Sequence, residues 1–285
     1  MVYLKGFSLV SENTENIILS EEKRTYFHNQ YPFRIFPKKE FNDIKFSDVT
    51  ILYGGNGSGK STILNIIANR LNCDGSFGVH GEMMMKYLKH CKFETSMEYF
   101  EEAKIIRSDD VFDYISNVRR INNRGFSQRE MLFREYFDNK NKTIDDMNDY
   151  QNLKNSIYAK RKSASNYVRN RALDKDVKEQ SNGESALMYF VSEIKENSLY
   201  LLDEPENSMS AAMQLKITKF LEESARFFNC QFIIATHSPF LLGMTGATIY
   251  DLDSVPVISK NFWELENMKL YCDFFKQNST KFEQK

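Results

Sequence analysis

Short apolar runs separated by polar turns recur along this chain and predict a sheet of buried strands. The clearest run is Val49–Tyr53, which is too short for a helix and rich in β-branched residues. Similar runs follow at residues 199–202, Gln231–Ala235 and 247–252. Each is a candidate strand, because a short apolar run bounded by turn signals is typical of a strand covered on both faces.

Helical spacing of apolar residues alternates with these runs. It extends over residues 60–71, 186–194 and 211–228. Strands that alternate with helices predict a mostly parallel sheet flanked by helices on both faces. We therefore expect an α/β fold whose functional residues lie beyond the carboxyl ends of the strands.

The middle of the chain follows a different pattern. Residues 113–178 are polar and charged, and Gly125 is the only helix breaker among them, which predicts two or more helices. A short strand is expected just before them, at residues 104–107. We expect one domain over residues 1–285, in which residues 82–180 form an inserted helical lobe.

The N-terminal region has two apolar runs. Residues 2–10 predict a first strand, and a polar loop then separates it from a second apolar run at residues 17–19.

A glycine-rich segment follows the strand Val49–Tyr53 and opens a helix. Gly54, Gly59, Lys60 and Ser61 fill the fixed positions of G-x-x-x-x-G-K-[ST]. Glycine lets backbone N–H groups turn inward, and the N-terminus of a helix favours an anion. A purely structural turn is the alternative, but the strand before the loop and the helix after it favour a phosphate site.

The residue types of the loop predict ATP and Mg²⁺ as ligands. Lys60 supplies a positive charge for the β- and γ-phosphates, and Ser61 supplies a hydroxyl for Mg²⁺. The expected nucleotide contacts come from the whole loop: Gly54, Gly55, Asn56, Gly57, Ser58, Gly59, Lys60, Ser61 and Thr62.

Polar side chains end two further strands. Asp203 and Glu204 follow the run at residues 199–202, where Asp203 can hold Mg²⁺ through water and Glu204 can orient or deprotonate the attacking water. The alternative is a solvated acidic turn. His237 follows the strand Gln231–Ala235, and at the same edge of the sheet it can donate to the γ-phosphate.

The segment Q-S-N-G-E-S at residues 180–185 precedes another predicted helix. Ser181 and Glu184 have the spacing of a capping box, which is a local structural role. The same helix end can also be offered to a phosphate, and the two roles are compatible.

The order of these motifs, phosphate loop, S-N-G-E, L-Y-L-L-D-E-P-E and T-H-S, resembles that of ABC-type ATPases. The residues within these motifs are similar to those of small soluble ATPases near the RecF and SMC branch. The resemblance implies a P-loop NTPase fold, ATP hydrolysis and an ATP-dependent homodimer. In that dimer Ser181 and Gly183 would reach the γ-phosphate on the partner's loop, and residues 207–209 would cross the interface.

The resemblance has gaps as well. The family usually carries a glutamine that joins Mg²⁺ to the helical lobe, and here only Asp109 or Asp110 is available, of which we choose Asp109 as the metal ligand. Glu184 near ATP is unfavourable unless it points away. Catalysis is therefore expected to be slow or to depend on a partner.

An aromatic residue ahead of the loop is expected to stack on adenine. The candidates are Tyr31, Phe33 and Phe36, at least two of which are expected in the core.

Composition and charge limit which partners and which cellular compartment we expect. The formal net charge is −1, so a nucleic-acid contact needs a local patch. One candidate is the stretch from Lys154 to Arg171, which has no acidic residue and contains Tyr158 and Tyr167, although a solvated basic helix face is favoured. No apolar run reaches membrane length, no signal peptide is evident, and four scattered cysteines suit reduced thiols, so we expect a cytoplasmic protein.

Three functions remain open. The first is an ATPase that drives or gates a protein partner, such as an effector or a nuclease, in DNA maintenance or bacterial anti-phage defence. The second is the ATPase subunit of a transporter. The third is a slow nucleotide-gated regulator of a nuclease or toxin.

Overall fold

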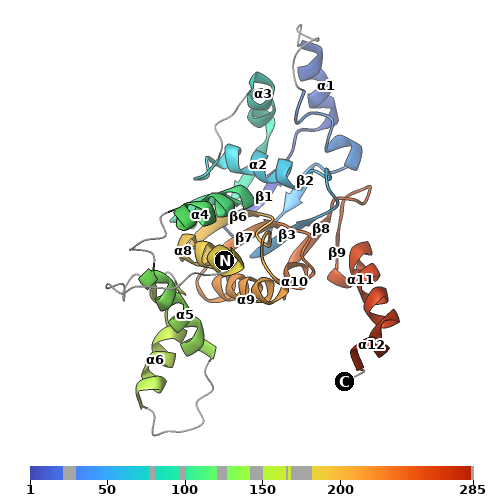
Figure 1. Cartoon of the computed structure of the whole chain (residues 1–285). Coiled ribbons are helices and arrows are strands. Elements are labelled where there is room, and N and C mark those ends of the chain that lie inside the picture. The colour runs from blue at the N-terminus through green and yellow to red at the C-terminus, as the bar shows by residue number, and fades with distance from the viewer. Residues whose placement is uncertain are drawn as a thin grey trace.

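A six-stranded sheet forms the centre of the computed structural model, in the order β5-β6-β7-β3-β8-β9 (Figure 1). The structure describes residues 1–21, 30–76, 81–96, 101–120, 127–141, 150–164, 166–167 and 182–283. The first five strands in that order run parallel, and β9 is an antiparallel edge strand. The strands are β3 (Val49–Tyr53), β5 (Glu102–Arg107), β6 (Ser198–Asp203), β7 (Gln231–Ala235), β8 (Thr248–Asp251) and β9 (Ile258–Lys260).

A smaller antiparallel sheet lies beside the first. Its order is β2-β1-β4, from β1 (Leu4–Ser8), β2 (Asp43–Lys45) and β4 (Lys92–Thr95). The buried amide of Gln231 joins the two sheets, because it accepts from the N–H groups of Tyr3 and Leu4 at 2.9 and 2.8 Å. It also donates to the carbonyl of Leu4 at 2.8 Å. A polar side chain at the start of β7 is thus satisfied in the core.

Helices cover both faces of the central sheet, as the alternating pattern predicts. α2 (Lys60–Leu71) and α3 (Glu82–His90) contribute to one buried cluster together with the small sheet. α4 (Ser108–Arg120), α8 (Asn182–Glu193) and α9 (Ala211–Phe227) contribute to the cluster on the other face. The doubly covered α/β architecture predicted from the sequence is confirmed.

α5 (Ser127–Asn141) and α6 (Tyr150–Lys160) pack on each other at the lower left of Figure 1. Tyr136, Tyr158 and Tyr167 form a ring cluster there, with Tyr167 fully buried and 5.3 Å from Tyr136 between ring centroids. Tyr167 is therefore a core residue and does not present its ring to a nucleic acid. Lys154, Lys160 and Arg161 of the basic stretch are exposed, whereas Arg169 and Arg171 lie outside the described residues.

The stretch 82–180, expected as a helical lobe, also contains strands. β4 pairs with β1 and β5 pairs with β6, so both belong to the sheets. β5 is the strand expected at residues 104–107, whereas β4 was not expected: its four residues are exposed, and pairing with β1 places it in the small sheet, so residues 82–107 do not belong to a helical lobe. The described helical part begins with α4.

The N-terminal region differs from its expected loop. α1 (Glu12–Glu21) begins where a polar loop was predicted and carries the apolar run at 17–19. Ile18 and Glu15 are its buried residues, and Glu15 accepts from the N–H of Arg34 at 2.7 Å. This contact across 19 residues could not be recognised from local polarity.

Short elements complete the described chain: η1 (Pro37–Lys39), α10 (Pro239–Leu242), η2 (Phe262–Glu264), α11 (Glu266–Gln277) and α12 (Ser279–Glu283). Among the helices described, none combines the length and apolar character needed to cross a bilayer.

Candidate nucleotide-binding site

The glycine-rich loop joins β3 to α2, the element order that the motif predicts. Gly57 and Gly59 have φ angles of 77° and 105°, a region that favours glycine. A Cβ on Gly59 would also lie 3.2 Å from a ring carbon of Phe36. α2 starts directly after this glycine, so the first N–H groups of the helix face the loop without intrahelical acceptors.

Lys60 is buried at the centre of the loop. Its Nζ donates to the carbonyls of Gly54 and Gly55 at 2.7 and 3.2 Å, and it shares a hydrogen bond of 2.7 Å with Nε2 of His237. Burial lowers the pKa of Lys60 below its ordinary value, and the carboxylate of Glu204 acts in the opposite direction. β7 thus brings His237 to the loop, at the edge expected from the parallel strand order.

Ser61 and Asp203 meet across the end of β6. The hydroxyl of Ser61 donates to Oδ1 of Asp203 at 3.0 Å. Burial raises the pKa of Asp203, while this hydrogen bond lowers it. A hydroxyl and a carboxylate oxygen converging at the start of α2 are the oxygen donors that Mg²⁺ accepts, so these two residues fit a magnesium site.

Asp109 forms no hydrogen bond with Ser61 or Asp203 among those found in the described part of the chain. It is exposed in the first turn of α4, while Asp110 accepts from the N–H of Arg107 at 2.8 Å. Among the described residues, no three or more His, Cys, Asp or Glu side chains gather as a metal cluster. The role of Asp109 as a metal ligand stays a prediction.

Glu204 lies between the loop and β7. Its Oε1 is 3.6 Å from Nε2 of His237, and its Oε2 accepts from the side-chain amide of Asn207 at 3.0 Å. The backbone of Glu204 has φ 48°, and its N–H donates to the carbonyl of Ala235 at 2.8 Å. This left-handed backbone conformation is unusual for a glutamate and directs the side chain toward His237. Such conformations cluster at functional sites.

Glu206 is a site residue that sequence reasoning missed. Its exposed fraction is 9%, and Oε1 accepts from the hydroxyl of Thr236 at 2.6 Å and from the N–H groups of His237 and Ser238 at 2.9 and 3.1 Å. The carboxylate therefore fixes the backbone that carries His237. Its signal was the second glutamate of D-E-P-E, but its partners become evident only when β6 and β7 are paired.

Asp253 is a second missed residue. It follows β8, and its Oδ2 accepts from the N–H of Gly55 at 2.7 Å. A Cβ on Gly54 would lie 3.2 Å from Oδ1 of Asp253. This aspartate anchors the beginning of the loop from 198 residues away, which no local motif could indicate.

Replacing Asp253 separates its hydrogen bond from its charge. Asp253→Ala is expected to weaken ATP binding about tenfold, because a hydrogen bond to a charged acceptor contributes about 1.5 kcal/mol or more. Asp253→Asn keeps an acceptor and removes a negative charge, so it should bind ATP at least as tightly as the native chain. Calorimetric titration of both variants tests this role, and equal losses in the two would contradict it.

The S-N-G-E segment is only partly described. Ser181 lies outside the described residues, and Gly183 is buried in the first turn of α8. A Cβ on Gly183 would lie 3.3 Å from Cγ of the flexible Met213 side chain and 3.5 Å from the carbonyl oxygen of Ser208, so Gly183 packs against the loop at residues 208–209. Glu184 forms an ion pair with Arg134 of α5 at 3.4 Å.

The aromatic candidates for adenine differ in exposure. Phe33 and Phe36 are buried at 5% and 0%, whereas Tyr31 is 39% exposed. Two of the three are therefore core residues, as expected, and Tyr31 alone among them offers an accessible ring.

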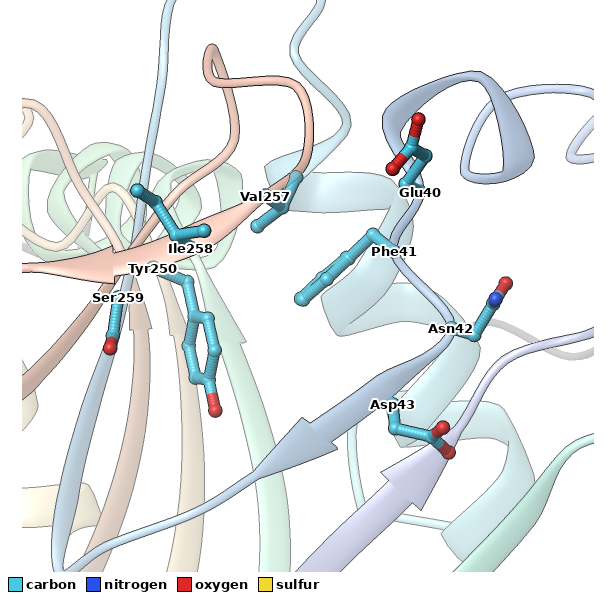
Figure 2. A pocket seen from close by; sticks show the side chains of 8 residues that line it. All are labelled: Glu40, Phe41, Asn42, Asp43, Tyr250, Val257, Ile258 and Ser259. Carbon is cyan, nitrogen blue, oxygen red and sulfur yellow. The ribbon is translucent and has the colours of Figure 1, made fainter.

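A pocket of about 440 Å³ lies between the segment before β2 and the strands β8 and β9 (Figure 2). Phe41 and Tyr250 line it, with ring centroids 5.6 Å apart. The hydroxyl of Tyr250 bonds both backbone groups of Lys45, at 3.1 and 2.9 Å. The residues that line this pocket include none from the phosphate loop.

Comparison with known proteins identifies the class. The family model described as "ABC transporter" matches residues 42–207, more than half of the chain. The chain therefore belongs to this family, and it carries an ABC-type ATPase domain with a P-loop fold. A second model, described as "AAA domain, putative AbiEii toxin, Type IV TA system", matches residues 175–243.

Solved structures similar to this chain include both SMC heads and ATP-binding cassettes. The SMC head domain from Thermotoga maritima is 15% identical, with 87% of this chain and 94% of that chain covered and a TM-score of 0.43. The Smc head from Pyrococcus furiosus bound to the C-terminal domain of ScpA is 13% identical, with 96% and 100% covered and a TM-score of 0.44. A dimeric post-hydrolysis ATP-binding cassette bound to ADP and Pi is 15% identical, with 92% and 99% covered and a TM-score of 0.40. The search of curated proteins found no match.

Proposed function

We propose that this chain binds ATP with Mg²⁺ and hydrolyses it in a head-to-tail homodimer. The observation that carries this proposal is the convergence of Lys60, His237 and Glu204 beside the pair formed by Ser61 and Asp203. These residues come from the carboxyl ends of neighbouring parallel strands and from α2. A cation, a candidate base and two candidate oxygen ligands therefore lie around one loop at this edge of the sheet.

Each residue would perform a separate part of the reaction. Lys60 would exchange its carbonyl partners for β- and γ-phosphate oxygens, and His237 would hold the γ-phosphate. Glu204 would orient the attacking water and take its proton. Ser61 and Asp203 would hold Mg²⁺, which would supply positive charge to offset that of the phosphates.

The second half of each site would come from another copy. Ser181 and Gly183 at the start of α8 would reach the γ-phosphate on the partner's loop, since a helix N-terminus favours an anion. The ion pair of Glu184 with Arg134 supports this arrangement, because it directs the acidic side chain toward α5. Ser208 and Met209 adjoin Gly183, as residues of a loop at the same interface would.

Phosphate release from ATP tests the activity. Under single-turnover conditions with the chain in excess, we expect Mg²⁺-dependent release of inorganic phosphate that EDTA abolishes. Because turnover can be slow without a partner, bound ATP and released phosphate are measured on the same sample. ATP that stays intact on the protein through a long incubation with Mg²⁺ would overturn the proposed hydrolysis.

What the cycle serves is a further part of the proposal. We favour an ATPase that drives or gates a protein partner, such as an effector or nuclease in defence, and the second family description supports that choice. A transporter subunit is the other candidate, supported by the description of the first family. Affinity purification from the native host separates them, because a membrane protein would accompany the chain only in the second case.

A further inference from the structure

The C-terminal helix α11 carries large apolar side chains on its surface. Its beginning is anchored, because Leu265 and Met268 are buried at 0% and 6%. The side chains that follow are exposed by between 47% and 60%, and Trp263 just before the helix is 67% exposed. This C-terminal apolar face consists of Trp263, Leu270, Tyr271, Phe274 and Phe275.

The face is continuous along the helix. Leu270 and Phe274 are four residues apart, as are Tyr271 and Phe275, so each pair lies on neighbouring turns of α11. The rings of Phe274 and Phe275 are 5.5 Å apart between centroids. In Figure 1, α11 and α12 continue past the β9 edge at the lower right and end in the C-terminus.

We propose that the C-terminal apolar face binds the same face of a second copy, in an antiparallel helix pair that forms without nucleotide. Five half-exposed large side chains present about 500 Å² of apolar surface, at the upper end of the patches found on monomers. Two copies would bury about 1,000 Å² of apolar surface together, which reaches the lower limit for a specific interface before the flanking charged residues are added. A two-fold pairing uses one surface twice and therefore closes.

The charges beside the face favour a second copy over another occupant. Glu266, Lys269, Asp273 and Lys276 are exposed and alternate in sign along one side of α11. A two-fold axis at Tyr271 places Glu266 opposite the partner's Lys276. The same axis places Lys269 opposite the partner's Asp273. The row of charges is thus complementary to itself when the helices run antiparallel, and it would oppose like charges if they ran parallel in register.

This dimer differs from the head-to-tail arrangement of the proposed function, because it needs neither ATP nor the phosphate loop. It brings two chains together before nucleotide binds. Its failure therefore leaves the proposed ATPase untouched, and a failure of ATP hydrolysis leaves this interface untouched.

Light scattering after size-exclusion chromatography, with EDTA and no nucleotide, tests the interface at micromolar concentration. The native chain is expected to be a dimer, and Leu270→Asp combined with Phe274→Asp is expected to be a monomer. Phe227→Asp is the matched control, since Phe227 is 64% exposed at the end of α9, and it should stay dimeric. A cooperative thermal unfolding transition near the native temperature confirms that the double variant is folded.

A charge exchange tests the orientation of the two helices. Asp273→Lys should weaken the dimer about fivefold, because exposed ion pairs contribute modestly. Adding Lys269→Asp to the same chain should restore the dimer. A monomeric native chain would overturn the proposal, as would a dimer that survives the double aspartate variant. A monomer that binds lipid vesicles through this face would also overturn it.

Discussion

Lys60→Ala is expected to abolish ATP binding, with a loss of affinity of about 100-fold or more. The ammonium is the only cation of the loop itself, and hydrogen bonds to charged groups contribute about 1.5–3 kcal/mol each. The carbonyl of Gly54 and the ring of His237 hold it inside the loop that we propose binds phosphate. Calorimetric titration with ATP and Mg²⁺ measures the loss.

The same variant should fold normally. Burial disfavours the charged form of Lys60, which is why its pKa lies below the ordinary value. Lys60→Ala removes a desolvated charge but also the donor to the carbonyls of Gly54 and Gly55, so the two effects oppose each other and the melting temperature without ATP should change little. Lys38→Ala is the matched control, because Lys38 is exposed in η1. This variant should bind ATP as the native chain does. Native affinity in Lys60→Ala would remove the loop from its proposed role.

Glu204→Gln is expected to slow ATP hydrolysis by about 10²–10⁴-fold while ATP binding is retained, because the amide cannot accept the proton of water. The amide can still accept the hydrogen bond from Asn207, so the local structure should persist. ATP should then accumulate intact in the head-to-tail dimer. Phosphate release and ATP affinity are measured on the same preparation.

Glu12→Gln, at the exposed start of α1, is the control for this exchange and should hydrolyse ATP at the native rate. Unchanged hydrolysis in Glu204→Gln would assign the base to another group. A combined loss of binding and turnover would instead indicate that Glu204 supports the loop.

Local patterns predicted the strand, glycine-rich loop and helix of the candidate site because their signals are close together in the chain. β3 and α2 occur at the residues that apolar spacing indicated, and the loop joins them. The meeting of His237 with Lys60 followed from one added rule, that parallel strands end at the same edge of a sheet. Short-range patterns and that rule therefore placed most of the candidate site.

The site residues that the sequence did not predict depend on contacts between residues far apart in the chain. Asp253 reaches Gly55 across 198 residues, and Glu206 binds the backbone of His237 only because β6 and β7 are neighbours. The sequence motifs contain these residues without showing what they contact. The boundary of the helical lobe failed for the same reason, since β4 becomes a strand through pairing with β1.

The central claim is that each ATP site is built by two chains, and mixed dimers test it most directly. One chain carries Lys60→Ala, which disables its own loop, and the other carries Ser181→Arg, which would block the contact that we propose with the nucleotide on its partner's loop. The two are co-expressed with different affinity tags, and pairs holding both are isolated. We predict that either variant alone releases almost no phosphate, whereas the mixed pairs, which keep one intact composite site, regain Mg²⁺-dependent release. Mixed pairs as inactive as both parents, or a Ser181→Arg chain with native activity, would contradict the account.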